Sequence, residues 1–186
     1  MLGARQSGHI NSVGFSLYTR LLAEAVEELK ASRAGKSVEE TMSSRLPPPS
    51  VTLPLAAFIP EDYVPDEKLR LHLYRRLAGL STLAAVDDMA QELEDRFGEL
   101  PQPSVSLLYQ LRLKILALTA GVQAISNEEG QVVIKAEGLG GAEGKWLQRR
   151  LGNKARVGRR QVWLPLDARG RWRELLPDIL LTMAEM

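Results

Sequence analysis

The sequence predicts an α+β protein, with an N-terminal helical appendage followed by a helix-rich domain that has a small antiparallel sheet and packed helices. Two observations predict this class. Between residues 66 and 120, apolar side chains recur every three or four positions, the period of a helix with one buried face. After Gly121 the apolar residues form short β-favouring runs separated by turns, as strands do. Helices followed by strands favour α+β over an alternating parallel fold.

The stretch from Phe58 to Pro103 predicts two consecutive helices. Pro65 stands at the start of the first helix, where its missing N–H costs nothing. The buried stripe of this helix is predicted to be Leu69, Leu73, Leu77 and Leu80. Ser81 or Thr82 is the expected N-cap of the second helix, and Gly98 is placed to take the left-handed conformation at its end. The second buried stripe is predicted to be Leu83, Val86, Ala90, Leu93 and Phe97.

The chain before this pair is predicted to contain a loop, a helix and a linker. Residues 1–11 have no apolar period, and Asn11 or Ser12 opens a helix that ends between residues 31 and 35. Residues 36–50 are polar and then proline-rich, which is typical of an exposed linker. Residues 51–58 are predicted to form an edge strand or an extended segment, because Pro54 interrupts the run.

The chain after the pair is predicted to hold one more helix and then the sheet. Ser104 to Ala120 is apolar almost all round, which predicts a helix that is covered on most sides. The remaining elements are predicted as a hairpin of residues 122–125 and 131–136, a glycine-rich loop at 138–144, a helix at 145–151, a hairpin of residues 155–157 and 161–166 that turns at Gly158, and a final helix at 171–186. Pro177 marks a late start or a kink in that final helix.

Composition excludes several classes of protein. The chain has 186 residues, 45% of them hydrophobic, and no cysteine, so it can bury a core but holds no disulfide and no thiolate metal site. No apolar run is long enough to span a membrane and no signal peptide is evident, so we expect a soluble, cytoplasmic protein. The net charge of +1 hides an asymmetry, with ten acidic and five basic residues at 61–99 but ten basic and one acidic at 145–173.

Four carboxylates have a spacing that predicts one face of the second helix. They are Asp88, Glu92, Asp95 and Glu99, at positions i, i+4, i+7 and i+11. One interpretation is a solvated face that keeps the domain soluble. The other is a docking surface for a basic partner.

Catalytic and metal sites are not indicated. A phosphate-binding loop at Gly138–Gly144 would need glycine where Leu139 stands and Ser or Thr where Trp146 stands. His9 and His72 have no second ligand at metal-binding spacing, so no metal is predicted. No nucleophile has an evident base, and no cofactor is expected for this chain.

The basic segment has two interpretations. Its residues are Lys145, Arg149, Arg150, Lys154, Arg156, Arg159 and Arg160, interleaved with Trp146 and Trp163. This composition is typical of a surface that binds nucleic-acid phosphates and stacks bases. Arginines around a hairpin can also serve only to protect a sheet edge, and tryptophans beside strands are commonly core residues.

Two blocks of the sequence resemble a known family. The first, L-G-A-R-Q-S-G-H-I-N-S-V-G-F-S-L-Y-T-R-L-L-A-E-A-V at Leu2–Val26, is similar to the tail of the motor, the translocation motif shared with the helicase RecG. The second joins I-P-E-D-Y-V-P-D-E-K-L-R-L-H-L-Y-R-R-L at Ile59–Leu77 to E-L-E-D-R-F-G-E-L-P at Glu92–Pro101. Together they resemble the C-terminal end of bacterial transcription-repair-coupling factor, an ATP-driven DNA translocase.

The resemblance implies a domain plan. Residues 1–35 would be the tail of the motor, with Gln6 and Gly8 in the motif that couples ATP hydrolysis to movement on DNA. Residues 36–50 would be a linker, and residues 51–186 a C-terminal regulatory domain. The Walker motifs are absent from this chain. We therefore expect no ATP hydrolysis by it alone, with ATP and Mg²⁺ belonging only to the full-length protein.

The resemblance also implies a latch. The family's C-terminal domain packs on the N-terminal repair-recruitment domain and masks the surface that binds the damage-recognition subunit of the excinuclease until RNA polymerase is engaged. Glu92 and Asp95 match acidic positions that pair with arginines across that contact. The full-length partners would be RNA polymerase, that excinuclease subunit and double-stranded DNA. Two alternatives remain, a DNA-binding accessory module that uses Lys145–Arg173 and a stand-alone enzyme.

Overall fold

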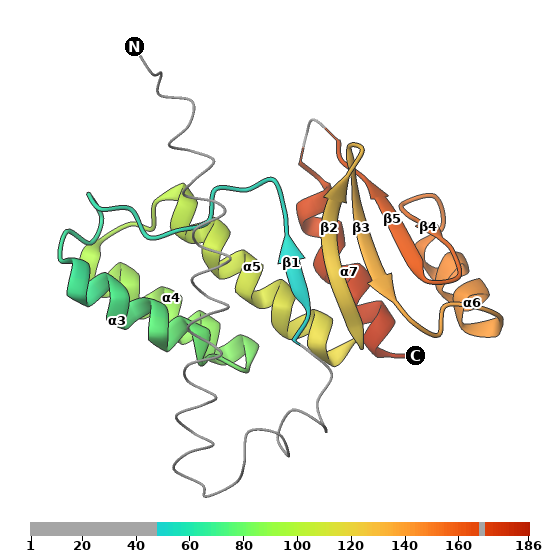
Figure 1. Cartoon of the computed structure of the whole chain (residues 1–186), viewed down its shortest axis with the longest axis horizontal. Helices are drawn as coiled ribbons and strands as arrows, with labels where there is room; N and C mark the ends of the chain where they lie inside the picture. Colours follow the sequence, from blue (N-terminus) through green and yellow to red (C-terminus); the bar gives the residue numbers. More distant parts are fainter. Residues whose placement is uncertain (1–47, 168–169) are drawn as a thin grey trace, which may run out of the picture. The chain divides into compact units, whose positions relative to one another are not determined.

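The computed structural model describes residues 48–167 and 170–186, which fall into two compact units (Figure 1). The first unit contains residues 55–109, and the second contains residues 48–54 and 110–186. The predicted N-terminal loop and helix, and with them Gln6 and Gly8, lie outside the described residues. The domain boundaries at residues 35 and 50 stay predictions.

Two helices of the first unit follow the predicted pattern closely. Helix α3 spans Glu67–Ala78, and it begins two residues after Pro65 because the side chain of Asp66 caps it, accepting a hydrogen bond from the Leu69 N–H at 3.0 Å. Helix α4 spans Leu83–Phe97 and is capped by Thr82, which accepts from the Ala85 N–H at 3.2 Å. At its other end Gly98 has a φ of 86°, which only glycine adopts readily.

The buried stripes of α3 and α4 agree in part with those predicted. Leu73, Leu77, Val86 and Leu93 are buried, whereas the flanking members are half-buried. Met89, which was not among the predicted core residues, is 3% exposed and lies one turn after Val86. Helix α5, Gln102–Thr119, begins in the first unit and buries Leu107 and Leu108 there. It is less covered than predicted, because Val105 and Leu118 are 42% and 64% exposed.

The segment before α3 is fixed by polar contacts. The Ile59 N–H donates to the hydroxyl of Tyr74 at 2.8 Å, and the Phe58 N–H donates to the Pro103 carbonyl at 3.2 Å. Arg70 donates to the carbonyl of Val64 at 2.7 Å, so a residue of α3 closes the turn that precedes it. Because these backbone groups are satisfied internally, residues 58–66 pack without regular secondary structure.

The second unit is built on a five-stranded sheet with the order β1-β2-β3-β5-β4. Its strands are β1 (Ser50–Thr52), β2 (Val122–Glu128), β3 (Gln131–Ala136), β4 (Arg156–Val157) and β5 (Gln161–Pro165). The edge strand expected near residue 51 is present, but it pairs parallel to β2. The sheet is therefore mixed, because the predicted antiparallel strands are joined by one parallel pairing at the edge. The α+β class is confirmed.

Both predicted hairpins form. Strands β2 and β3 pair antiparallel and turn at Glu129 and Gly130, both with positive φ, which matches the right-handed twist of the strands. Strands β4 and β5 pair antiparallel around Gly158, whose N–H donates to the Gln161 carbonyl at 2.8 Å. A side chain at position 158 would come within 2.6 Å of the Trp163 ring, so the turn requires glycine.

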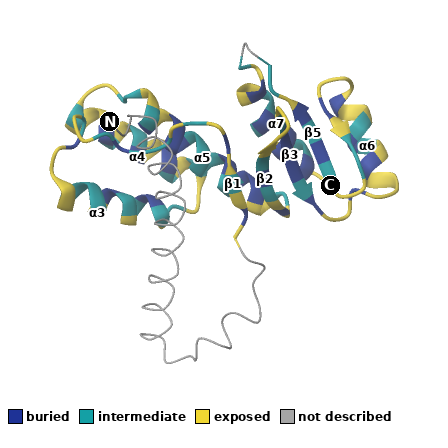
Figure 2. Cartoon of the chain, turned by 45° about the horizontal axis from the view of Figure 1, so that its top comes forward, coloured by how far each residue is buried: buried dark blue, intermediate teal, exposed yellow. Residues whose placement is uncertain are grey.

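Helices cover one face of this sheet. Val132, Ile134 and Ala136 of β3 alternate along the strand, and all three are at most 3% exposed. Their partners Val162 and Leu164 on β5 extend the same buried face. Helix α7, Trp172–Ala184, packs on the sheet through Leu176, Ile179 and Leu180, and it continues past Pro177 (Figure 2).

Helix α6, Ala142–Leu151, begins three residues before its predicted start, and Gly144 in its first turn explains the glycine-rich loop. A Cβ atom at Gly144 would overlap the carbonyl group of Leu139. Leu139 is 3% exposed, so its buried side chain anchors the loop at this point. Glycine at this position therefore allows the backbone of α6 to pack closely on the backbone of Leu139. This packing accounts for the glycine without a bound phosphate.

We expect Gly144→Ala to lower the free energy of unfolding by about 1–3 kcal/mol, because the added methyl group overpacks a buried site. Alanine would otherwise favour a helix. Urea unfolding followed by circular dichroism measures this. Gly140→Ala is the matched control, since a Cβ there meets nothing within 4 Å, and it should change stability by less than about 0.5 kcal/mol. Equal stability of the two variants would contradict this account.

Candidate docking surface

The structure places three of the four predicted carboxylates on α4. Asp88 and Asp95 are exposed, and Glu92 is half-buried. Glu99 is exposed but lies beyond the end of the helix at Phe97, so the predicted i+11 position does not extend the helical face. The correction follows from Gly98, which turns the backbone out of the helix. Among the described residues Asp88, Asp95 and Glu99 make no ion pair.

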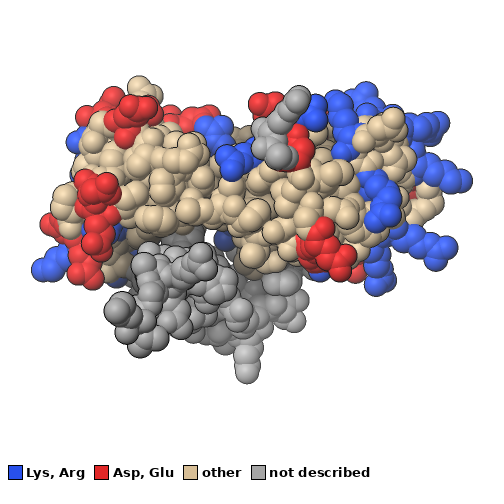
Figure 3. All heavy atoms as spheres, turned by 90° about the horizontal axis from the view of Figure 1, so that it is seen from above, with Lys and Arg blue, Asp and Glu red and all other residues tan. Residues whose placement is uncertain are grey.

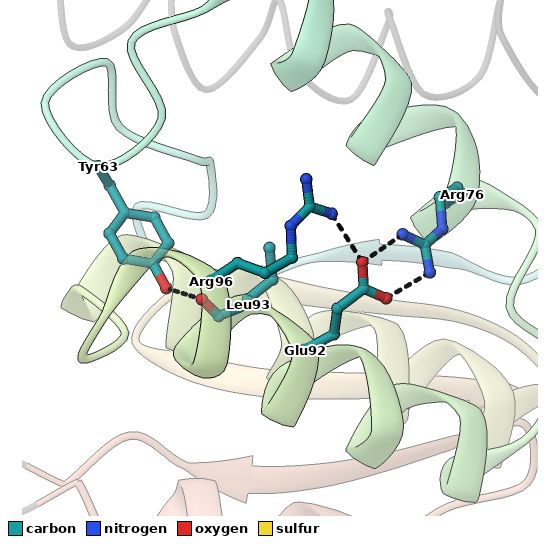
Figure 4. Close-up of polar contacts among 5 residues, drawn as sticks. All are labelled: Tyr63, Arg76, Glu92, Leu93 and Arg96. Carbon is teal, nitrogen blue, oxygen red and sulfur yellow. Dashed lines mark hydrogen bonds and ion pairs between the residues drawn. The ribbon is translucent and has the colours of Figure 1, made fainter.

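Glu92 is held by two arginines of its own unit (Figure 4). Arg76 on α3 donates from both terminal nitrogens, with Nη1–Oε1 at 2.6 Å and Nη2–Oε2 at 2.5 Å. Arg96, one turn further along α4, donates to Oε1 at 2.8 Å. The bidentate geometry restricts both side chains, so Arg76 and Glu92 join α3 to α4. This internal pairing was not predicted from the sequence.

The arginines change the acidity of this carboxyl group. Hydrogen bonds from Arg76 and then Arg96 lower the pKa of Glu92 from 4.5 to about 2. The same hydrogen bond raises the pKa of Arg76 above its ordinary value. The side chain of Glu92 is 31% exposed and that of Arg76 38%, so water screens the attraction and the stabilisation is modest.

We expect Glu92→Gln to lower the free energy of unfolding by about 1 kcal/mol at neutral pH. The folded-state pKa lies below the unfolded one, so this stabilisation is complete above pH 4.5 and is lost as the pH falls to about 2. Denaturant unfolding at several pH values measures it. The difference in the free energy of unfolding between the wild type and the variant should disappear across that range. The control is Glu94→Gln, a substitution of an exposed neighbour. A difference in unfolding free energy between wild type and Glu92→Gln that does not change with pH would contradict the role given to the ion pair.

A shallow hollow of about 400 Å³ lies beside this ion pair. It is lined by residues from the end of α3, from the connection that follows it and from α4, namely Arg75, Arg76, Gly79, Leu80, Ala85, Asp88, Met89 and Glu92. Two of the predicted carboxylates, Asp88 and Glu92, are on its wall, and Asp95 is not. Its lining combines side chains of both charges with apolar groups.

Tyr63 fixes the end of α4. Its hydroxyl group donates to the carbonyl oxygen of Leu93 at 2.9 Å (Figure 4), and it also lies 2.9 Å from the carbonyl oxygen of Gly98. Its ring packs edge-on against Phe97, with centroids 5.8 Å apart. Burial first, and then the charge of Glu94, raises the pKa of Tyr63. The phenol stays protonated at neutral pH and donates to the backbone at the C-terminal end of α4.

Three residues that support the surface were not predicted from the sequence, Tyr63, Arg76 and Arg96. Arg96 had a signal, since an arginine four residues after Glu92 on a helix is a favourable pair. Arg76 had none, because its partner is on another helix and depends on how α3 packs against α4. Tyr63 lies inside a block that was recognised, but nothing in the sequence indicated its hydrogen bonds.

The predicted basic residues come together on the second unit. Arg149 and Arg150 are on α6, Arg156 is on β4, and Arg159 and Arg160 are in the β4–β5 turn. All five are exposed, and Figure 3 shows Lys and Arg side chains gathered at the part of this unit that carries α6 and β4. Within residues 48–167 and 170–186, no group of three or more acidic or histidine side chains is arranged to hold a metal ion. None of the helices described there has the length and apolar character needed to cross a membrane.

Comparison with known proteins identifies the class. Residues 53–140 match the model of the TRCF domain. A crystal structure of the C-terminal domain of transcription-repair coupling factor superposes with a TM-score of 0.63, covering 74% of this chain and 94% of that chain. At 20% sequence identity this similarity shows the shared fold.

Curated relatives agree with that class. The transcription-repair-coupling factor of Escherichia coli (strain K12) is 39% identical over 138 residues, which cover 74% of this chain and 12% of the relative. Those of Mycobacterium tuberculosis (strain CDC 1551 / Oshkosh) and Bacillus subtilis (strain 168) are 38% and 33% identical, over 72% and 71% of this chain and 11% and 10% of their own lengths. The chain thus spans about a tenth of these relatives. It carries a TRCF domain, and the predicted resemblance to the transcription-repair-coupling factors is confirmed.

Proposed function

We propose that this chain is the C-terminal part of a DNA translocase that couples transcription to nucleotide excision repair, and that α4 is a latch. In this proposal the exposed face of α4 binds the repair-recruitment domain of the same protein. That contact masks the site for the damage-recognition subunit of the excinuclease until RNA polymerase is engaged. The exposure of Asp88 and Asp95 on one face of a helix, without ion pairs of their own, is the observation that supports it.

The expected strength suits a latch that must open. Ion pairs between exposed side chains contribute about 0.2–1 kcal/mol each, so two or three of them hold a surface only weakly. A competing interaction of a few kcal/mol can then release it. Salt would weaken the same contact, because exposed charges are screened over about 10 Å at 0.1 M ionic strength.

Unlike Asp95, Glu92 is already paired with arginines of its own unit. Its assignment to the contact stays a prediction, and a partner arginine would have to share the carboxylate with Arg76 and Arg96 or displace one of them. Reversing its charge would also set three cations together. A test of the latch is therefore sharper when it leaves Glu92 unchanged.

The test is Asp88→Arg with Asp95→Arg, which should weaken binding to the isolated repair-recruitment domain by about tenfold. Isothermal titration calorimetry at low salt measures this. The control is Glu137→Arg with Glu174→Arg, which makes the same change of charge at two exposed sites of the second unit. In the full-length protein the first pair of substitutions should also increase capture of the excinuclease damage-recognition subunit. Equal affinities for the two variants would overturn the proposal.

We also expect no ATP hydrolysis by this chain alone, since its sequence contains no Walker motif. Release of phosphate in the presence and absence of duplex DNA measures this. A DNA-stimulated rate that scales with the concentration of the purified chain would favour the stand-alone enzyme instead.

A further inference from the structure

The second unit carries an unbroken run of positive charge. Residues 145–166 include seven basic side chains and no acidic one. These residues, the basic surface, are Lys145, Arg149, Arg150, Lys154, Arg156, Arg159 and Arg160, and every one of them is exposed. Such a density of like charge repels itself, so it is a cost to the fold unless an anionic partner neutralises it.

The fold gathers these charges into one surface. Gln148 of α6 donates to the carbonyls of Gly152 and Ala155, at 2.8 and 3.0 Å, and accepts from the Val157 N–H at 2.8 Å. One side chain therefore fastens α6, the following turn and β4 together. Because β4 is the edge strand of the sheet, the arginines of α6 and of the β4–β5 turn lie on adjoining elements (Figure 1).

The unit leaves most of these charges without a counterion. Arg150 forms a long ion pair with Glu185 at 3.4 Å, and both side chains are 59% exposed. Among the described residues Lys154, Arg159 and Arg160 make no ion pair. The basic surface thus keeps its positive charge in the folded chain. Protection of the sheet edge alone would not require seven basic residues.

The two tryptophans near the basic surface already contact arginines of the same chain. The guanidinium of Arg156 lies 4.3 Å from the centre of the Trp163 ring, and Gly158 packs against the rim of the same ring. Arg150 lies 5.7 Å from the ring centre of Trp146. Because the chain's own arginines cover these rings, they offer little room for unpaired bases, and contacts to a sugar–phosphate backbone remain.

We propose that the basic surface binds the phosphate backbone of double-stranded DNA without sequence preference. This inference goes beyond the latch, because it concerns another surface on another unit. Duplex DNA presents one negative charge per about 1.7 Å of axis, a density that can meet several arginines at once. An acidic protein surface is a competing partner, and the experiment below separates the two.

The experiment is fluorescence anisotropy of a labelled duplex of about 20 bp, two helical turns, titrated with the full 186-residue chain. With about four phosphate contacts, log Kobs against log salt should have a slope of about −3.6. The affinity should then fall about 150-fold between about 50 and about 200 mM salt. No binding at the lower salt concentration would overturn the proposal.

Arg159→Gln and Arg160→Gln test the surface residue by residue. Each should reduce the salt slope by about 0.9 if its side chain contacts a phosphate. Both are exposed and neither makes an ion pair, so thermal unfolding should match that of the wild type. Lys68→Gln on α3 removes the same charge from the first unit and is the control. An equal effect of Lys68→Gln would mean that only net charge matters and would overturn the assignment.

Two competitors decide the class of partner. Unlabelled duplex should displace the labelled duplex more effectively than poly-glutamate of equal total charge. Single-stranded DNA of the same length should compete no better than duplex, because the indole rings are covered. Superior competition by poly-glutamate would identify an acidic protein as the partner, and superior competition by the single strand would indicate base stacking. Either result would overturn the proposal.

Discussion

The bidentate ion pair between Arg76 and Glu92 determines what the first unit can present to a partner. It joins α3 to α4, and with Arg96 it removes one carboxylate from the acidic face. Asp88 and Asp95, before and after Glu92, are left exposed on a helix that this pair and Tyr63 hold in place. A docking surface needs this combination, because side chains on a fixed helix lose less entropy on binding than those on a mobile loop.

The two segments of the second family-like block, Ile59–Leu77 and Glu92–Pro101, are physically joined. Tyr63 in the former donates toward carbonyl oxygens of Leu93 and Gly98 in the latter, and Arg76 in the former binds Glu92 in the latter. The tyrosine contacts the C-terminal end of α4, and the arginine binds a residue further back in the same helix. Contacts between the two segments thus join them into one helix pair.

The sequence predicted the helices and hairpins well because local signals encode them. Thr82 and Gly98 mark the ends of α4 through their own capping groups and backbone conformations. The parallel pairing of β1 with β2 could not be predicted, since it joins segments about 70 residues apart in the chain. The docking surface could be predicted in part for the same reason. The helical period of the sequence predicted α4, whereas the ion pairs of Glu92 depend on tertiary packing.

The two surfaces have opposite signs, and their energetics differ for that reason. The acidic face of α4 can offer only a few exposed pairs, so its contact is weak and easily reversed. The basic surface faces a polymer whose phosphates repeat regularly, and the release of counterions makes each added contact steeply dependent on salt. A chain with a net charge of only +1 can therefore contain a releasable protein contact and a sequence-independent DNA contact, provided that its charges are segregated along the sequence as they are here.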